Sequence, residues 1–343
     1  TLSRVYWMTG EEKYLEWAVR LGDYYLLGDH HPIRDSEQLR LRDHGCEIVS
    51  GLCELYLMVA HAHKEKQDVY KAPIHQMLDR ILEVGVNKYG LMYNVVNPQN
   101  GEVINEGIAD NFGYNYNGFY SAYLVDQEEK YLEAIHIALS NLGFYKSFDW
   151  ENGSADGYAD AIEGALNLYN RMPDSTTADW LDSEIRIMWS MQDSSHRENT
   201  EQWRGSGIIE GWHGDGNFAR TSLMYCFWKT QGTYLKPWRP DLKWGSVARD
   251  EGILLVIEAE KDWAGKLYFD QPRHKSYLNL PIDYPRINQF PEWFVVEPEE
   301  SYTIEYVDVG TTRAYQGNEL IEGIDLELEK GERLVLRVFS GND

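Results

Sequence analysis

The sequence has few cysteines and few basic residues for its length. Three cysteines stand among 343 residues, an odd and sparse number that argues against a disulfide framework. Lys and Arg total 32 against 56 Asp and Glu, which gives a formal net charge of −24 at pH 7. A field of that sign repels nucleic acid and anionic membranes, so we expect neither as a partner. An acidic small substrate stays open, because one local arginine outweighs a distant net charge.

The chain also lacks a long apolar run and a visible secretion signal. No run approaches the roughly 18 apolar residues that span a bilayer, and no signal-peptide pattern opens the sequence. The first residues, TLSRVYWMTGEEKYLEWAVRL, instead read as the end of one helix running into another, without a start Met. We therefore expect a longer parent protein, and secretion is not judged from this end.

Pairs of amphipathic helices are predicted over the first two thirds of the chain. The stretches YWMTGEEKYLEWAVRL and YLVDQEEKYLEAIHIAL share an apolar helix end, a short acidic turn and the letters EKYLE. Such self-similarity is typical of stacked helical hairpins. Apolar residues recurring at i, i+3 and i+4 predict helices over about 44–63, 68–84, 114–126, 128–142, 155–171, 175–191 and 215–231. Ser175 or Thr176 is the expected N-cap of the sixth.

The two helices of each pair differ in composition. First members, such as GYADAIEGALNLYN, are rich in Gly, Ala and aromatics, whereas second members, such as STTADWLDSEIRIMWSMQ, carry charges on one face. Inner and outer helices in alternation predict an (α/α) toroid. Six hairpins close such a ring and the sequence supplies about four and a half, so we expect either hairpins before Thr1 or an open solenoid. The interior-looking start favours missing hairpins.

After Gly232 the pattern changes to short β-branched and aromatic segments. GILLVIEAE, GKLYFDQ, WFVVEP, SYTIEYVDV and ERLVLRVF are broken by Gly, Pro and Asp, which is typical of strands. The predicted fold class is therefore α plus β in two domains. A helical-hairpin toroid domain is expected over 1–235 and a small antiparallel β-sandwich domain over 236–343.

Each inner helix is preceded by a polar, Gly-rich approach. The four approaches are RLRDHGCE (40–47), INEGIADNFGYNYNG (104–118), DWENGSADGYAD (149–160) and IEGWHGDGNFAR (209–220). Inner helices of a toroid run the same way, so their N-terminal ends are expected to meet at one mouth of the ring. Free N–H groups and the positive dipole ends suit sugar hydroxyls or a carboxylate there.

The residue types at these approaches are those of a carbohydrate cleft. Tyr114, Tyr116, Tyr158 and Trp212 offer flat faces to sugar rings, and carboxylates accept hydrogen bonds from hydroxyls. The alternative for each tyrosine is core packing, and for each acid an ordinary helix cap. Repetition over four approaches favours a ligand cavity.

Glycosidic hydrolysis needs one protonated carboxyl and one base or nucleophile. We predict Asp156, Asp215 and Glu47 as catalytic, because they open three different inner helices. Other candidate acids are Glu106, Asp110, Asp160, Glu163 and Glu210. The predicted substrate-binding residues are His44, Asp110, Tyr114, Tyr116, Tyr158, Trp212, His213, Asn217 and Arg220. Arg220 could meet a uronate carboxylate or form a buried salt bridge with a neighbouring inner helix.

The sequence contains few residues at the spacing typical of a metal site. His44, Cys46 and Glu47 stand close in sequence, yet no second Cys/His pair of ligand spacing accompanies them. We expect no metal and no cofactor. Cys53 and Cys226, among apolar residues, are expected to be inert core thiols.

The sequence resembles the six-hairpin toroid carbohydrate enzymes of gut and marine bacteria, namely unsaturated glucuronyl hydrolases, toroid β-glucuronidases of glycoside hydrolase family 154 and toroid polysaccharide lyases with a β-sandwich. The resemblance is carried by TGEEKYLEWAVRL, HGCEIVSGLCELY, SADGYADAIEGALNLY and HGDGNFARTSLMY. It covers the helical part and the β-domain. It implies action on an acidic glycan by acids at inner-helix ends, and a periplasmic or secreted bacterial protein.

Three functions stay open at this point. The first is a glycoside hydrolase acting on uronic-acid-containing oligo- or polysaccharides. The second is a polysaccharide lyase with Tyr114, Tyr116, His44 or His213 as base and Asn111, Asn217 or Arg220 neutralising the uronate. The third is a non-catalytic glycan-binding or scaffolding protein. A homo-oligomer is compatible with all three.

Overall fold

The computed structural model describes residues 1–192, 216–249 and 252–341. It divides into two compact units, which are treated separately. The first contains 1–222 and a later segment, 279–289, and the second contains 223–278 and 290–343. The change from helices to strands falls after residue 229, close to the predicted 235, whereas the compact units part inside the last long helix.

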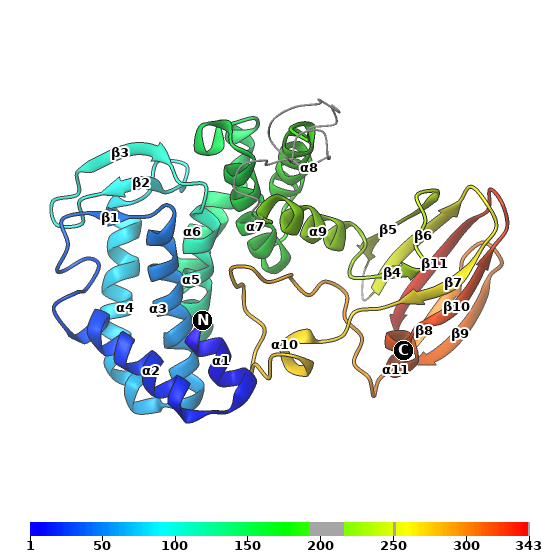
Figure 1. Cartoon of the computed structure of the whole chain (residues 1–343), viewed down its shortest axis with the longest axis horizontal. Helices are drawn as coiled ribbons and strands as arrows, with labels where there is room; N and C mark the ends of the chain where they lie inside the picture. Colours follow the sequence, from blue (N-terminus) through cyan, green and yellow to red (C-terminus); the bar gives the residue numbers. More distant parts are fainter. Residues whose placement is uncertain (193–215, 250–251, 342–343) are drawn as a thin grey trace, which may run out of the picture. The chain divides into compact units, whose positions relative to one another are not determined.

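Helices in antiparallel pairs build the first unit (Figure 1). The pairs are α1 (Leu2–Thr9) with α2 (Glu12–Gly22), α3 (His44–Ala62) with α4 (Lys64–Val84), α5 (Phe112–Asp126) with α6 (Glu129–Ser140) and α7 (Ala155–Arg171) with α8 (Ser175–Ser190). The helix α9 (Asn217–Lys229) follows without a described partner helix. Short helical turns lie at η1 (Asp23–Leu27), η2 (Leu142–Tyr145) and η3 (Trp150–Gly153). The predicted helices are confirmed, while closure into a ring stays a prediction.

The first members of the pairs lie against one another through small residues. A Cβ on Gly113 of α5 would lie 2.4 Å from the Cα of Gly164 in α7, so these helices cross at backbone contact. A Cβ on Gly118 of α5 would likewise lie 3.2–3.3 Å from atoms of Ser50 and Cys53 in α3. These glycines therefore allow the inner helices to approach closely.

Outer helices cover these inner ones with an aromatic core. Phe119 of α5 packs edge-on against Tyr131 of α6, with ring centroids 5.6 Å apart. Trp150 meets Trp180 of α8 in the same geometry at 5.9 Å. All four rings are fully buried, so burial of aromatic surface holds each pair together.

Two sequence expectations about these helices are corrected. The N-cap of α8 is Asp174, whose carboxylate accepts a 2.9 Å hydrogen bond from the Thr177 N–H, while Ser175 is the first helical residue. Among the described helices, α3 is long and apolar enough to cross a membrane by length and composition. From the sequence we had expected no apolar stretch of that length. The apolar window of α3 is 56% buried within the protein, as a core helix would be.

A three-stranded antiparallel sheet lies in the first unit, in the order β1 (Leu39–Arg40), β2 (Tyr93–Val96), β3 (Val103–Ile108). It was not predicted. Its last strand leads directly into the start of α5, and its first leads into the start of α3. The sheet therefore fixes where two inner helices begin.

The second unit has two antiparallel sheets over one hydrophobic core. The larger has the order β5-β6-β11-β8-β9 and the smaller β10-β7-β4. Their bounds are β4 (Tyr234–Lys236), β5 (Leu242–Arg249), β6 (Gly252–Ala259), β7 (Trp263–Tyr268), β8 (Ser301–Tyr306), β9 (Thr311–Gln316), β10 (Ile324–Leu328) and β11 (Arg333–Ser340), with short helices α10 (Arg273–Ser276) and α11 (Gly317–Glu322). Leu255, Leu267 and Leu336 lie in the shared core. The α plus β class is confirmed, although WFVVEP is not a strand and contributes a single bridge at Val295.

Candidate functional site

The first turns of three inner helices meet, as the toroid interpretation predicted. The Asn111 side chain, just before α5, accepts a 2.7 Å hydrogen bond from the Asp43 N–H at the start of α3. Its Nδ2 donates at 2.7 Å to Oδ2 of Asp160 in α7. One amide therefore connects three helix starts.

A fourth helix joins at the same end. Asn217, the first residue of α9, donates from Nδ2 to Oδ1 of Asp156, in the first turn of α7, at 2.5 Å. The Thr221 hydroxyl, one turn further on, donates to the Ala159 carbonyl at 3.1 Å. The described part of the polar approach 209–220 is thus hydrogen-bonded to the approach 149–160.

Asp43 adopts a backbone conformation that L-residues rarely occupy. Its φ is 47° and its ψ is −135° at the N-cap position of α3. Such strain persists where the surroundings fix the residue, and it concentrates at functional sites. Here the Asn111 bond holds the backbone, and guanidinium groups of Arg40 and Arg42 hold the carboxylate.

Asp110 is a buried carboxyl in this group, at 4% exposure. One of its oxygens accepts from the Asn111 N–H at 3.0 Å. Burial, followed by the neighbouring Glu151 carboxylate, raises the pKa of Asp110 to about 7, against the opposing pull of Arg42. Burial and the neighbouring carboxylate thus both favour the protonated form of Asp110.

Asp160 lies between other acids and accepts hydrogen bonds on both oxygens. In addition to Asn111, the Tyr114 hydroxyl donates to it at 2.9 Å. Burial raises the pKa of Asp160 well above its usual range, with Asp156 and Asp110 adding to the rise and the Tyr114 bond opposing it. On α7, Asp160 stands four residues after Asp156, so both carboxylates share one helix face.

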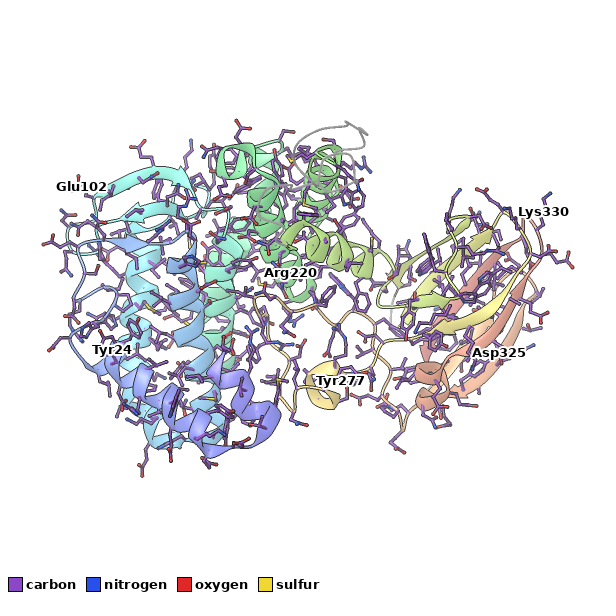
Figure 2. All side chains as sticks on the ribbon, viewed as in Figure 1. Tyr24, Glu102, Arg220, Tyr277, Asp325 and Lys330 are labelled. Carbon is purple, nitrogen blue, oxygen red and sulfur yellow. The ribbon has the colours of Figure 1, made fainter. Side chains whose placement is uncertain are left out.

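Arg220 forms the buried salt bridge that was one of its two predicted roles. From α9 (Figure 2) it contacts Glu163 of α7, with Nε 2.8 Å and Nη2 2.5 Å from Oε2. The other Glu163 oxygen accepts from the Asn288 N–H at 2.7 Å. The Glu163 side chain is fully buried, and such a carboxylate needs these partners to remain charged.

A second ion pair joins the segment before α3 to the turn before α7. Arg42 contacts Glu151 at 3.1 Å, and the Ser154 hydroxyl donates to the other Glu151 oxygen at 2.9 Å. The Ser154 oxygen in turn caps α7 by accepting from the Gly157 N–H. The start of α7 is thereby tied to the start of α3.

Several predicted site residues lie together, and others lie elsewhere. The structure gathers Asp110, Tyr114, Asp156, Asn217 and Arg220 in one acid cluster, with Asp160, Glu163, Asn111, Arg42, Asp43 and Glu151. The predicted Trp212, His213 and Asp215 lie outside the described residues.

Two predicted tyrosines belong to the core. Tyr116 is fully buried and its hydroxyl donates to the Gly90 carbonyl at 2.6 Å, away from the acid cluster. Tyr158 is also buried, and burial raises its pKa, with the Glu184 carboxylate of the outer helix α8 adding to the rise. Tyr114 alone of the three points its hydroxyl at the cluster. The core alternative therefore holds for two.

The two remaining predicted site residues, His44 and Glu47, lie at the start of α3 with exposed side chains. The His44 side chain is 93% exposed and lies 3.7 Å from that of Glu47, itself 62% exposed. Neither contacts the acid cluster in the described structure. Among the cysteines, Cys53 is buried as expected, whereas Cys226 is exposed and corrects the core assignment.

Arg42, Asp43 and Glu151 were not predicted, nor was the return of residues 279–289 to this unit. The signal for the first three was present, because they stand inside the polar approaches 40–47 and 149–160. The Asn288 contact joins residues 125 positions apart, for which the sequence holds no local pattern.

Comparisons with known proteins add only weak support. No family model matches the chain, and no curated protein matches it. A solved structure, the crystal structure of D-mannose isomerase, is similar with a TM-score of 0.42 and 13% identity. The match covers 64% of this chain and 65% of that one, so it spans less than two thirds of that protein's length. A likeness of this size does not establish a family.

Proposed function

We propose that the protein is a glycoside hydrolase that uses carboxylate acid/base catalysis at the acid cluster, on oligo- or polysaccharides containing uronic acid. Asp110 is the general acid and Asp156 is the base or nucleophile. Asp160, held between them by Asn111 and Tyr114, positions the pair.

The observation that carries this proposal is the burial of Asp110, at 4% exposure, close to other carboxyls. Burial raises its pKa to about 7, which favours the protonated form that leaving-group protonation needs. Asp156 is half-buried, close enough to raise the pKa of Asp160, and receives a hydrogen bond from Asn217. Two carboxyls in unlike surroundings, each close enough to Asp160 to act on its pKa, can divide acid and base roles between them.

The tyrosine-based elimination is less well supported. The Tyr114 hydroxyl already donates to Asp160, and burial raises its pKa well above the usual range. A phenol with a raised pKa stays protonated at neutral pH, so little phenolate is present to act as the base. Arg220, the proposed neutraliser, is paired with Glu163. Preference for a uronate rests on the sequence resemblance, and the Arg42 guanidinium is a cation close enough to act on Asp110.

The test is incubation with a panel of acidic plant, algal and animal glycans, followed by reducing-end detection and near-ultraviolet absorbance. Hydrolysis yields reducing ends without absorbance, whereas elimination creates an absorbing double bond conjugated to a carboxylate. Asp110→Asn and Asp156→Asn should each lower kcat by about 100-fold or more, while the exposed Asp325→Asn should leave it unchanged. Full activity in both cluster variants would sink the assignment.

A further inference from the structure

We infer that the first unit contains a binding site for one small neutral polyhydroxyl molecule, a monosaccharide or polyol, in a cavity next to the acid cluster. The cavity measures about 190 Å³. It lies between α1, the inner faces of α3 and α5, and residues 284–288. Asn117, three residues after Tyr114 along α5, lines it from the same helix face.

Asn117 is the observation that points to a ligand. The side chain is 2% exposed, and neither its Oδ1 nor its Nδ2 has a hydrogen-bond partner among the described residues. A buried amide without partners costs roughly 1–3 kcal/mol. An amide that lines a cavity and offers one acceptor and two donors matches sugar hydroxyls, each of which can donate and accept.

Other lining groups add polar contacts. The Nε of Arg286 is buried and likewise without a partner in the described chain. The hydroxyls of Ser50 and Ser121 donate to backbone carbonyls four residues earlier, which leaves their lone pairs able to accept. The cavity therefore offers donors and acceptors on two helices and the 284–288 segment.

Charge argues for a neutral ligand. The Arg4 guanidinium is held by Glu54, with contacts of 2.9–3.1 Å, and donates to the Ile287 carbonyl. Arg286 shares the Asp283 carboxylate, 3.1 Å away, with Arg171. Three cations, Arg4, Arg171 and Arg286, therefore stand against three carboxylates, which are Glu54, Asp283 and, at the rim, Glu47. This group has no net positive charge to hold an anion, and a neutral polyol needs none.

Size argues for one sugar unit. Sites for drug-sized ligands measure about 300–1,000 Å³, and this cavity is smaller. It also borders the acid cluster through Asn288, which lines the cavity and donates to Glu163. Binding does not depend on hydrolysis; only the role of the cavity as a subsite for a neutral unit of the glycan rests on the proposed function.

The test is calorimetric or ligand-observed NMR titration of the full chain with glucose, galactose, mannose, xylose and glycerol, and with glucuronate and inorganic phosphate as anions. At least one neutral compound should bind saturably and the anions should not. Asn117→Leu should weaken that binding at least tenfold while leaving the melting temperature unchanged or higher, because it removes an unsatisfied buried amide. The exposed Asp325→Asn should bind as the wild type does.

Other outcomes overturn the inference. These are preference for the anions, no neutral ligand at all, or unchanged binding in Asn117→Leu. Should Asn117→Leu fail to fold, Gly51→Leu replaces it, since a Cβ at Gly51 meets nothing within 4 Å and the side chain would occupy the cavity. Binding without any glycan cleavage would leave this site standing and remove the hydrolase. Cleavage without neutral-sugar binding would do the reverse.

Discussion

Asn111 donates a 2.7 Å hydrogen bond to Asp160 while its oxygen holds the strained backbone of Asp43. The same amide thus orients the Asp160 carboxylate in α7 and restrains the start of α3. It couples the position of the acid cluster to the fold of the approach that precedes α3.

Replacing Asn111 by Ala should therefore destabilise the protein by about 1–3 kcal/mol, because the Asp43 N–H and Asp160 both lose a partner. Denaturant unfolding measures the change. Asn111→Asp separates the two bonds: it keeps an acceptor for Asp43 but sets a carboxylate against Asp160. It should be no more stable than Asn111→Ala. Wild-type stability in Asn111→Asp would show that the bond to Asp160 contributes nothing.

Asp110 should make folding stability depend on pH between about 4 and about 7. Its pKa rises from 3.8 to about 7 on folding, so in this window the folded state binds the extra proton. Its contribution is fully present below the lower value and is lost as pH rises through the higher one, with a slope of up to about 1.4 kcal/mol per pH unit.

Asp110→Asn lacks this slope, so its stability relative to the wild type should increase from pH 5 to pH 8. Urea unfolding at several pH values measures the difference. Asp325→Asn changes the net charge equally at an exposed position and should show a constant difference. A constant difference for Asp110→Asn as well would contradict the raised pKa.

Removing Arg220 should destabilise the first unit more than removing an exposed arginine does. Arg220→Ala leaves the fully buried Glu163 carboxylate without its cation, at a cost of about 3–5 kcal/mol. Arg186→Ala, on the exposed face of α8, should cost less than about 0.5 kcal/mol. Thermal unfolding compares the two, and equal losses would mean that the Glu163 pair does not stabilise the fold.

The close crossing of α5 and α7 predicts that alanine at Gly113 lowers the stability of the protein. Alanine at Gly51, which lies in open space on α3, should raise it. Gly113→Ala forces a Cβ to within 2.4 Å of backbone, so overpacking should destabilise by about 1–3 kcal/mol or more. Gly51→Ala, where a Cβ meets nothing within 4 Å, should stabilise by up to about 1 kcal/mol through helix propensity. Chemical denaturation that ranks the two variants the other way would refute the close crossing.

The helices were predictable because their signal is local. The apolar period over 155–171 coincides with α7, and that over 44–63 with α3 to one residue. The N-terminal gathering of inner helices followed from the repeat of hairpins. Asp174 was missed as a cap because four polar residues in succession, 174–177, offered the same chemistry, and only the backbone conformation chooses among them.

The sequence predicted several residues of the acid cluster, but not which of them pair with one another or which carboxyl has a raised pKa. Asp156, Asn217 and Arg220 stand in polar approaches that the sequence singled out, and they do meet. Which carboxyl is protonated depends on burial and on Glu151, which no spacing reveals. Tyr116 and Tyr114, two residues apart, face the core and the cluster respectively, because positions two apart on a helix do not share a face.

The return of residues 279–289 to the first unit also has a consequence for synthesis on the ribosome. Glu163, Arg171 and Arg4 take partners from this segment, at Asn288, Asp283 and Ile287. Those partners are translated only after 223–278, which belong to the other unit. The nascent helical unit therefore emerges incomplete, and its last tertiary contacts form after most of the chain has left the exit tunnel.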